Sequence, residues 1–172
     1  SENMRFAHYN IIAKEIQKEI KSGTDGIIIT HGTDTLHYTA SALSFMLENL
    51  TIPVLLVGAQ RSSDRGSSDA YLNLNGAVNF ISNNRSYSGV AICMHNSTND
   101  DDIAIISGVK ARKMHSSRRD AFKAINSQPI ALVNKKGKIE YSKTYQSTIL
   151  NLSKDNSKQK FMRNFSTFFL NF

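Results

Sequence analysis

The stretch Ile27-Ile28-Ile29-Thr30-His31-Gly32-Thr33-Asp34-Thr35 decides the fold prediction. Three consecutive β-branched apolar residues predict a short buried strand, and the pattern changes at Gly32 to hydroxyl and carboxylate side chains. The residues from Leu36 onward predict a helix whose amino end faces the end of that strand. Because ligands of open α/β sheets bind at the carboxyl ends of strands, the sequence predicts chemistry at this turn.

The rest of the chain alternates helical and strand patterns. Isoleucines recur at helical spacing between Ile11 and Ile20, and Val54–Val57 is continuously apolar, as in a central strand of a parallel sheet. The order predicts an α/β protein of three layers with a mostly parallel, Rossmann-like sheet. The expected helices are 11–20, 36–50 (closed by Pro53) and 71–81, and the serines and Asp69 of a polar loop over 58–69 are expected to cap the third of them. The expected strands are 54–57, 90–94, 129–133 and 138–141, with a hairpin that turns at Gly108 from 103–106 into 110–115.

Composition predicts a globular protein that can bury a core, with one domain as the default count. The chain has 172 residues, of which 40% are hydrophobic, and its mean hydropathy is −0.32. No apolar run approaches the ~18 residues of a membrane-spanning helix, and the first residues do not form a signal peptide. We therefore expect a cytoplasmic protein. The single cysteine, Cys93, lies in an apolar run and is predicted to be a small buried hydrophobe rather than a nucleophile.

The positive charge is concentrated in the second part of the chain. Residues 1–104 hold 7 Lys and Arg against 11 Asp and Glu, whereas residues 105–172 hold 14 against 3, within a net charge of +7. Such asymmetry indicates a face for nucleic acid or for an acidic partner. The alternative is a solvated basic surface with a lysine-rich tail.

The residues themselves limit the possible chemistry. A threonine hydroxyl becomes a nucleophile, or positions a water molecule, when a base takes its proton, and lysine can serve as that base. Lys113 is a candidate because Arg112, Arg118 and Arg119 are close in sequence, and like charges disfavour a protonated ammonium. The alternative is an ordinary surface lysine. The histidines do not have metal-ligand spacing, and the scattered glycines form no phosphate-binding loop.

Several motifs resemble those of one enzyme family. Thr30-His31-Gly32-Thr33-Asp34-Thr35 resembles the second signature of the asparaginase/glutaminase family, and Ser1-Glu2-Asn3-Met4 resembles the substrate-binding segment upstream of it. Residues 58–65 and 112–122 resemble the D subunits of archaeal-type glutamyl-tRNA(Gln) amidotransferases more than a free asparaginase. The resemblance runs from Ser1 to about Tyr141, with four motifs in the correct order.

The resemblance implies a two-threonine site. Members of the family hydrolyse the side-chain amide of glutamine or asparagine with one nucleophilic threonine and a second group of threonine, aspartate and lysine. In this sequence the second group is Thr33, Asp34 and Lys113, with the backbone N–H groups near Gly32 stabilising the oxyanion.

The resemblance also implies substrate-binding residues and a truncated chain. Ser1 and Glu2 are expected to bind the α-carboxylate and α-amino groups of the substrate, and the Ala59 carbonyl to hold the leaving amide. The family's first motif, Thr-Gly-Gly-Thr, precedes the segment that Ser1 begins. We therefore expect a fragment without activity of its own. Its expected domains are an incomplete N-terminal α/β domain over 1–141, a polar linker over 142–160 and the start of a C-terminal domain over 161–172.

At the level of function, the resemblance implies an amidohydrolase subunit that releases ammonia from glutamine or asparagine to convert Glu-tRNA(Gln) to Gln-tRNA(Gln). The implied partners are the E subunit of the amidotransferase, tRNA(Gln) bound through the complex, and a second copy in a homodimer core. No cofactor is implied for this chain, because ATP and Mg are used by the partner subunit. Two alternatives remain: a stand-alone cytoplasmic L-asparaginase, and a non-catalytic binding module on the same fold.

Overall fold

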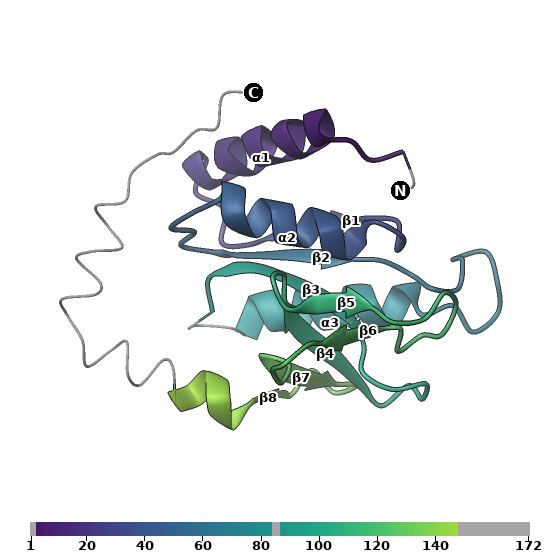
Figure 1. Cartoon of the computed structure of the whole chain (residues 1–172). Helices are drawn as coiled ribbons and strands as arrows, with labels where there is room; N and C mark the ends of the chain where they lie inside the picture. The colour runs from purple at the N-terminus through teal and green to yellow at the C-terminus, as the bar shows by residue number, and fades with distance from the viewer. Residues whose placement is uncertain (1–2, 84–86, 148–172) are drawn as a thin grey trace.

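Helices cover both faces of a six-stranded sheet in the computed structural model, which describes residues 3–83 and 87–147 (Figure 1). The strand order in the sheet is β1-β2-β3-β4-β7-β8, and β5 pairs with β6 in a separate hairpin. The helices are α1 (Phe6–Lys21), α2 (Leu36–Met46) and α3 (Ala70–Asn83), and the strands are β1 (Ile27–Thr30), β2 (Pro53–Val57), β3 (Gly89–His95), β4 (Asp102–Ser107), β5 (Ala111–Lys113), β6 (Phe122–Ala124), β7 (Ala131–Asn134) and β8 (Ile139–Tyr141).

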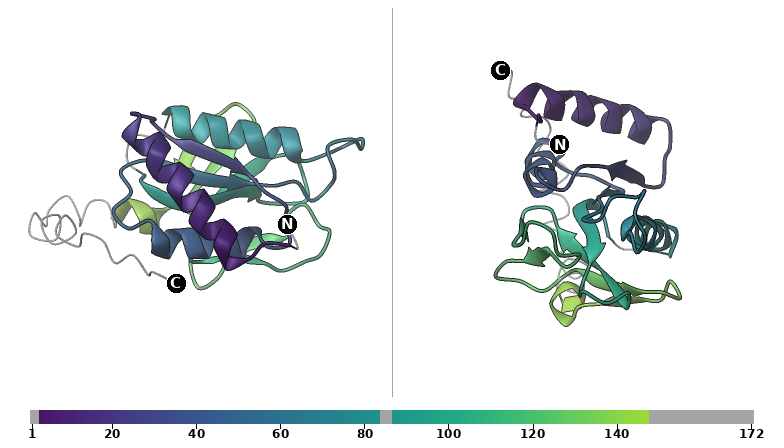
Figure 2. Two further views of the ribbon diagram at one scale, coloured as in Figure 1. Left: turned by 90° about the horizontal axis from the view of Figure 1, so that it is seen from above. Right: turned by 90° about the vertical axis from the view of Figure 1, so that its right-hand side faces the viewer.

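The sheet separates two hydrophobic cores. Leu56 packs with the side chains of α1, α2 and the β5–β6 hairpin on one face, whereas Leu55 packs with α3 on the other. Neighbouring residues reach different cores because successive side chains of a strand point to opposite faces. The two helical layers are seen on opposite sides of the sheet in Figure 2. The predicted α/β class and its three layers are therefore confirmed.

The sheet is mixed rather than mostly parallel. β1 pairs parallel to β2 and β2 parallel to β3, but the pairs β3–β4, β4–β7 and β7–β8 are antiparallel. The parallel pairs are joined by the crossover helices α2 and α3. No helix intervenes between β3 and β4 or between β7 and β8, and short loops join antiparallel strands.

The predicted burial of one strand and two predicted boundaries are wrong in detail. The isoleucines of β1 are half-buried, because β1 has a strand partner on one side only in the described part of the chain. Helix α2 ends at Met46 rather than at residue 50, and Asn49 then adopts a left-handed conformation with φ 59°. Pro53 begins β2 rather than closing the helix.

The predicted hairpin at Gly108 is also wrong, because its two segments do not pair with each other. β4 pairs with β3 and β7, whereas β5 pairs with β6. Gly108 lies where the chain leaves the sheet and crosses α2. A Cβ atom there would lie 2.6 Å from the Ser44 Oγ and 2.8 Å from the Ala40 carbonyl oxygen. Only glycine permits this approach, which carries the chain from the sheet to the hairpin above α2.

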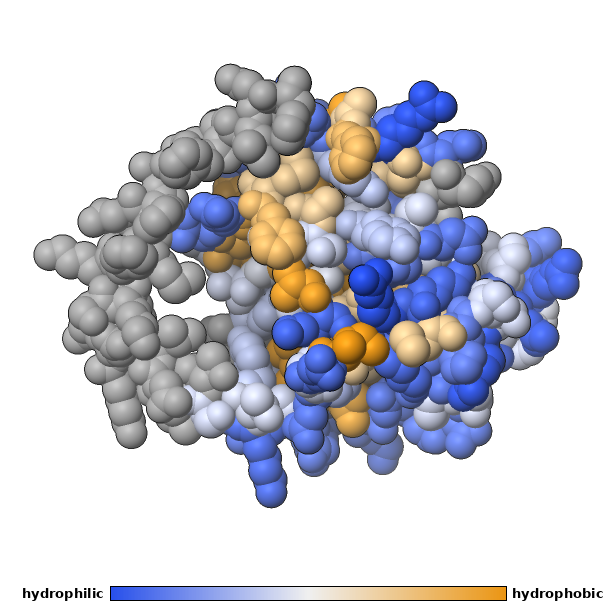
Figure 3. Space-filling model, viewed as in Figure 1, coloured by the Kyte–Doolittle hydropathy of each residue, from blue (hydrophilic) through white to orange (hydrophobic). Residues whose placement is uncertain are grey.

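Helix α2 presents apolar side chains on both sides. Leu36 and Leu43 are fully buried, while Phe45 is 72% exposed. Apolar residues gather on the face that carries α1, α2 and β5, between more hydrophilic margins (Figure 3). Helix α2 therefore has exposed apolar side chains in addition to those on its buried face.

Two expectations lie outside the described residues. The polar segment beyond residue 147 and the aromatic stretch over 161–172 belong to this part of the chain, so the proposed linker and C-terminal boundaries stay predictions. In the described ranges, no helix is both long and apolar enough to cross a membrane.

Gly108→Ala is expected to destabilise the protein by about 1–3 kcal/mol, because the added methyl group overlaps the backbone of α2. The matched control is Gly66→Ala, since a Cβ atom at Gly66 meets nothing within 4 Å. Urea unfolding of the two variants measures the difference. Equal stability of both variants would contradict the tight crossing at Gly108.

Candidate active site

The centre of the candidate site is one lysine that contacts two residues far away in the sequence. The Lys113 Nζ lies 2.9 Å from the Thr33 Oγ1 and 2.9 Å from the Asp34 Oδ1. Thr33 and Asp34 lie in the turn between β1 and α2, while Lys113 ends β5. The Lys113 side chain is 10% exposed and that of Asp34 is 66% exposed. The structure thus brings together the three residues predicted to be catalytic.

The surrounding fold explains this meeting. Lys113 pairs with Phe122 across the β5–β6 hairpin, and Phe122 is buried in the core beside α2. On the other side, the His31 N–H donates to the Val57 carbonyl oxygen at 2.8 Å, which extends the β1–β2 pairing into the turn. The His31 ring contacts the Gly32 carbonyl oxygen and the Thr39 hydroxyl. The turn and the hairpin are therefore each held in place by contacts that do not involve the Lys113 ammonium.

The charges around Lys113 differ from the prediction. Arg118 forms a two-bond ion pair with Asp120, and Arg119 pairs with Asp100 at 2.6 Å. These arginines are thus neutralised by other carboxylates, and the nearest described charge to Lys113 is the opposite one of Asp34. The hydrogen bond and the charge of Lys113 hold the pKa of the Asp34 carboxyl below its usual range.

The loop after β2 forms the third side of the site. A Cβ atom at Gly58 would lie 2.9 Å from the His31 carbonyl oxygen and 3.0 Å from the Thr33 Cγ2, so the backbone before Ala59 runs directly against the threonine turn. The Gln60 Nε2 donates to the Arg118 carbonyl oxygen at 2.9 Å. The turn after β1, the loop after β2 and the segment after β5 therefore converge.

Two predicted site residues belong to the part of the chain that the structure does not describe. Ser1 and Glu2 fall outside the described residues, so their role in substrate binding stays a prediction. Gly32 and Ala59 lie in the two converging loops, as expected for the backbone groups assigned to them. Cys93 is buried, and burial raises the pKa of its thiol, in accord with its prediction as a core residue.

Sequence reasoning missed a buried polar cluster beneath this site. Asp69, Asn73 and His95 are all fully buried, whereas the sequence predicts only a helix cap formed by Asp69 and the serines before it. The Ser68 Oγ accepts a hydrogen bond from the first N–H of α3, while the Asp69 carboxylate accepts two from loop backbone. The available signals were an asparagine within the apolar stripe of α3 and a histidine that ends an apolar strand.

Among the described residues, no group of three or more His, Cys, Asp and Glu is arranged to hold a metal ion.

Comparisons with known proteins agree on one family. The model described as "Asparaginase, N-terminal" matches residues 1–147. The chain is 52% identical over 134 residues to the D subunit of the glutamyl-tRNA(Gln) amidotransferase of Methanococcus vannielii, which covers 78% of this chain and 31% of the relative. It is also 52% identical over 141 residues to the D subunit of the Pyrococcus furiosus amidotransferase, covering 82% and 32%. The chain therefore spans about a third of the length of these relatives.

Solved structures give the same fold. The thermostable L-asparaginase of Thermococcus kodakarensis superposes with a TM-score of 0.72 at 34% identity, covering 81% of this chain and 39% of that one. The probable cytoplasmic L-asparaginase of Campylobacter jejuni gives a TM-score of 0.72 at 34% identity, with 83% and 44% covered.

Lys113→Met is expected to raise the pKa of Asp34 toward its ordinary value, because the ammonium no longer stabilises the carboxylate. The native pKa of Asp34 lies below the unfolded one, so the ion pair stabilises the fold above the unfolded pKa. This contribution is lost as the pH falls through the native pKa. Carboxyl carbon NMR titration measures the shift. Asp120, which pairs with Lys123 and Arg118, is the control carboxyl and should be unchanged. An unchanged Asp34 titration would contradict the pair.

Proposed function

This chain belongs to the asparaginase family, and we propose that it supplies the Thr33, Asp34 and Lys113 group of an amidohydrolase site. The observation that carries the proposal is the position of the Lys113 Nζ, 2.9 Å from both the Thr33 hydroxyl and the Asp34 carboxylate. A base must lie within about 2.6–3.2 Å of the group whose proton it takes, and Lys113 satisfies this condition.

In the proposed mechanism, the neutral amine form of Lys113 takes a proton from Thr33 or from a water molecule that Thr33 positions. Asp34 orients the lysine, and the backbone N–H groups near Gly32 stabilise the negative charge that develops on the amide oxygen. Thr33 thus acts as an activating group that positions the water molecule. The covalent intermediate is assigned to the threonine of the family's Thr-Gly-Gly-Thr motif, which does not occur in this sequence.

The substrate contacts come from the other converging segments. The Ala59 carbonyl accepts a hydrogen bond from the leaving amide, while Ser1 and Glu2 bind the α-carboxylate and α-amino groups. Glutamine and asparagine both fit these contacts, because the two substrates share the amide and the α-groups and differ by one methylene.

The proposed biological role is that of the D subunit of an amidotransferase, which releases ammonia for the conversion of Glu-tRNA(Gln) to Gln-tRNA(Gln). The identity of 52% to D subunits of such enzymes, against 34% to the L-asparaginases, supports this assignment. The proposal includes the E subunit as partner, tRNA(Gln) bound through the complex, a homodimer core and a cytoplasmic location. It assigns no cofactor to this chain and gives ATP and Mg to the partner subunit.

Thr33→Val and Lys113→Met are each expected to lower ammonia release from glutamine by about 10²-fold or more, as loss of a general base or of the group it activates does. The assay uses the complete protein that carries these residues. Thr33→Val keeps the methyl group that contacts Gly58, so the loss reports on the hydroxyl. Thr51→Val, at an exposed position between α2 and β2, is the control. Full activity of either site variant would contradict the assignment of Thr33 and Lys113, whereas no ammonia release by the unmodified protein would favour a non-catalytic binding module.

A second measurement separates the amidotransferase role from a stand-alone asparaginase. Glutaminase activity of an amidotransferase should rise when the partner subunit and Glu-tRNA(Gln) are added, because product use is coupled to ammonia supply. Activity that is high on asparagine and indifferent to both additions would favour the L-asparaginase.

The basic second part of the chain has a narrower proposed role than its charge suggested. Lys113, Arg118 and Arg119 form ion pairs within the site region. In contrast, Lys135, Lys136 and Lys138 lie at the β7–β8 turn, where no described carboxylate forms an ion pair with them. We propose this turn as the tRNA-facing part of the basic surface.

Replacing Lys135, Lys136 and Lys138 together with Gln is expected to weaken tRNA binding by the assembled complex. Each lost phosphate contact should make the slope of log K against log salt shallower by about 1. A salt titration of tRNA affinity measures this slope, with Lys14, Lys18 and Lys21 of α1 replaced in the control. An unchanged slope would assign the turn to ordinary solvated surface.

A further inference from the structure

A chain of buried hydrogen bonds lies beneath the loop that carries Ala59. The Asp69 carboxylate accepts hydrogen bonds from the Gln60 N–H at 3.0 Å and the Arg61 N–H at 2.9 Å. The Asn73 Nδ2 donates to the same carboxylate at 3.0 Å and to the Gly58 carbonyl oxygen at 2.9 Å. Asp69 and Asn73 are fully buried, so these bonds are shielded from water.

These contacts fix both peptide units that flank the Ala59 Cα. Asn73 holds the Gly58 carbonyl, which belongs to the peptide unit before Ala59. Asp69 holds the Gln60 N–H, which belongs to the same planar unit as the Ala59 carbonyl. In a trans peptide the N–H and C=O groups point in opposite directions, and the described chain has no cis peptide bond. The Ala59 carbonyl is therefore aimed away from Asp69.

The chain of contacts continues to the segment after Lys113. Because the Asn73 Nδ2 donates to two acceptors, its Oδ1 must accept, and the His95 Nδ1 lies 2.6 Å from it. The second ring nitrogen of His95 lies 3.3 Å from the Asp100 Oδ1, which also accepts from Arg119. Arg119 donates in turn to the Ser67 carbonyl oxygen. The loop after β2 is thus held at its start by Asp69 and Asn73 and near its end by the contact of Arg119 with Ser67.

We propose that Asn73 and His95 are positioning residues for amide hydrolysis, which act by aiming the Ala59 carbonyl at the leaving amide. The inference rests on the proposed function, since that function gives the Ala59 carbonyl its role. Asp69 orients the carbonyl directly, Asn73 holds Asp69 and Gly58 in place, and His95 fixes the orientation of the Asn73 amide.

A comparison of two substrates tests this role. Glutamine has an amide N–H that the Ala59 carbonyl can accept, whereas glutamic acid γ-methyl ester has none, and attack occurs at the same carbon in both. In the complete protein, Asn73→Ala should lower kcat/KM for glutamine about tenfold relative to the ester, as expected for the loss of one hydrogen bond. A purely structural defect would lower both rates equally, and that result would overturn the proposal.

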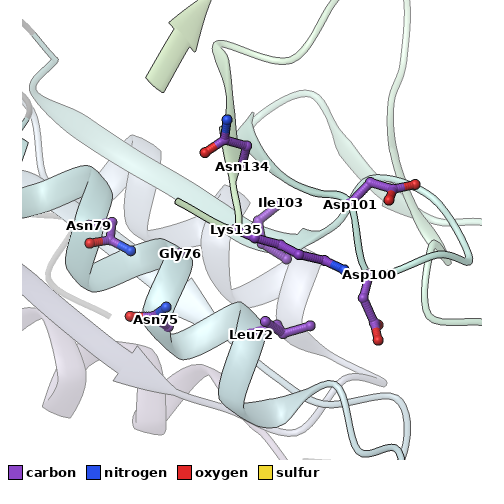
Figure 4. A pocket seen from close by; sticks show the side chains of 9 residues that line it. All are labelled: Leu72, Asn75, Gly76, Asn79, Asp100, Asp101, Ile103, Asn134 and Lys135. Carbon is purple, nitrogen blue, oxygen red and sulfur yellow. The ribbon is translucent and has the colours of Figure 1, made fainter. Parts of the chain in front are cut away.

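The matched control is Asn75→Ala. Asn75 lies two residues further along α3 and lines a small cavity with Asn79 and Lys135 (Figure 4). Its glutamine-to-ester ratio should equal that of the unmodified protein. His95→Asn should retain the ratio and His95→Ala should lose it, because an asparagine amide nitrogen occupies the position of the histidine Nδ1. Equal behaviour of the two His95 variants would overturn the role of His95.

Hydrogen exchange provides a second test, which does not depend on enzymatic activity. The amide protons of Gln60 and Arg61 should exchange at least about tenfold faster in Asn73→Ala than in Asn75→Ala, while β2 and β3 stay equally protected. Unchanged exchange at Gln60 and Arg61 would overturn the inference even if the enzyme is inactive. If the unmodified protein hydrolyses neither substrate but exchange responds as expected, the proposed function fails and the positioning of the loop stands.

Discussion

The contact of the Lys113 ammonium with Thr33 and Asp34 is the constraint on which the rest of the site depends. The residues are separated by about 80 positions, and a bond of 2.9 Å leaves little tolerance for error in either segment. The sheet supplies one fixed point, because the turn continues the pairing of β1 with β2. The hairpin supplies the other, because Phe122 anchors it in the core beside α2. A polar contact of this kind is therefore a consequence of apolar packing on both sides of it.

The sequence was sufficient to predict the elements that have a strong period. The apolar run of β2, the helical isoleucine pattern of α1 and the break at Gly32 each reflect a local rule, and each element appears in the structure near its predicted position. The pattern of α1 was less exact, because the helix begins at Phe6 and Ile11 is exposed. Pairing between strands was less predictable. An apolar run such as Ile103–Ile106 is the same whether its neighbour is parallel or antiparallel. The reason that it does not pair with β5 is the close approach of Gly108 to α2, which involves residues about 65 positions earlier.

In the candidate site, too, local features were predictable from the sequence and contacts between distant segments were not. Thr33 and Asp34 were predictable because they follow a strand directly, and Lys113 because its motif resembles a family pattern. The environment of Lys113 was not predictable from its neighbours in sequence. Arg118 and Arg119 are close to Lys113 in sequence, but Arg118 forms an ion pair with Asp120 and Arg119 with Asp100. Charge counted along the sequence thus did not predict these two ion pairs, because the count does not show which charges the fold brings into contact.

The buried polar cluster explains why the loop after β2 has one conformation. The N–H groups of Gln60 and Arg61 follow the end of β2, and buried backbone groups without partners are costly. Asp69 satisfies both, but a buried carboxylate needs further donors, and Asn73 supplies one of them. Asn73 then needs an acceptor for its amide and a donor for its oxygen, which the Gly58 carbonyl and His95 provide. Each polar group therefore requires the next. An apolar cluster of the same volume would fill this space without specifying the direction of any peptide unit. The hydrogen-bond requirements of the loop thus account for polar residues at positions where the period of α3 and the apolar run of β3 alone favour hydrophobic ones.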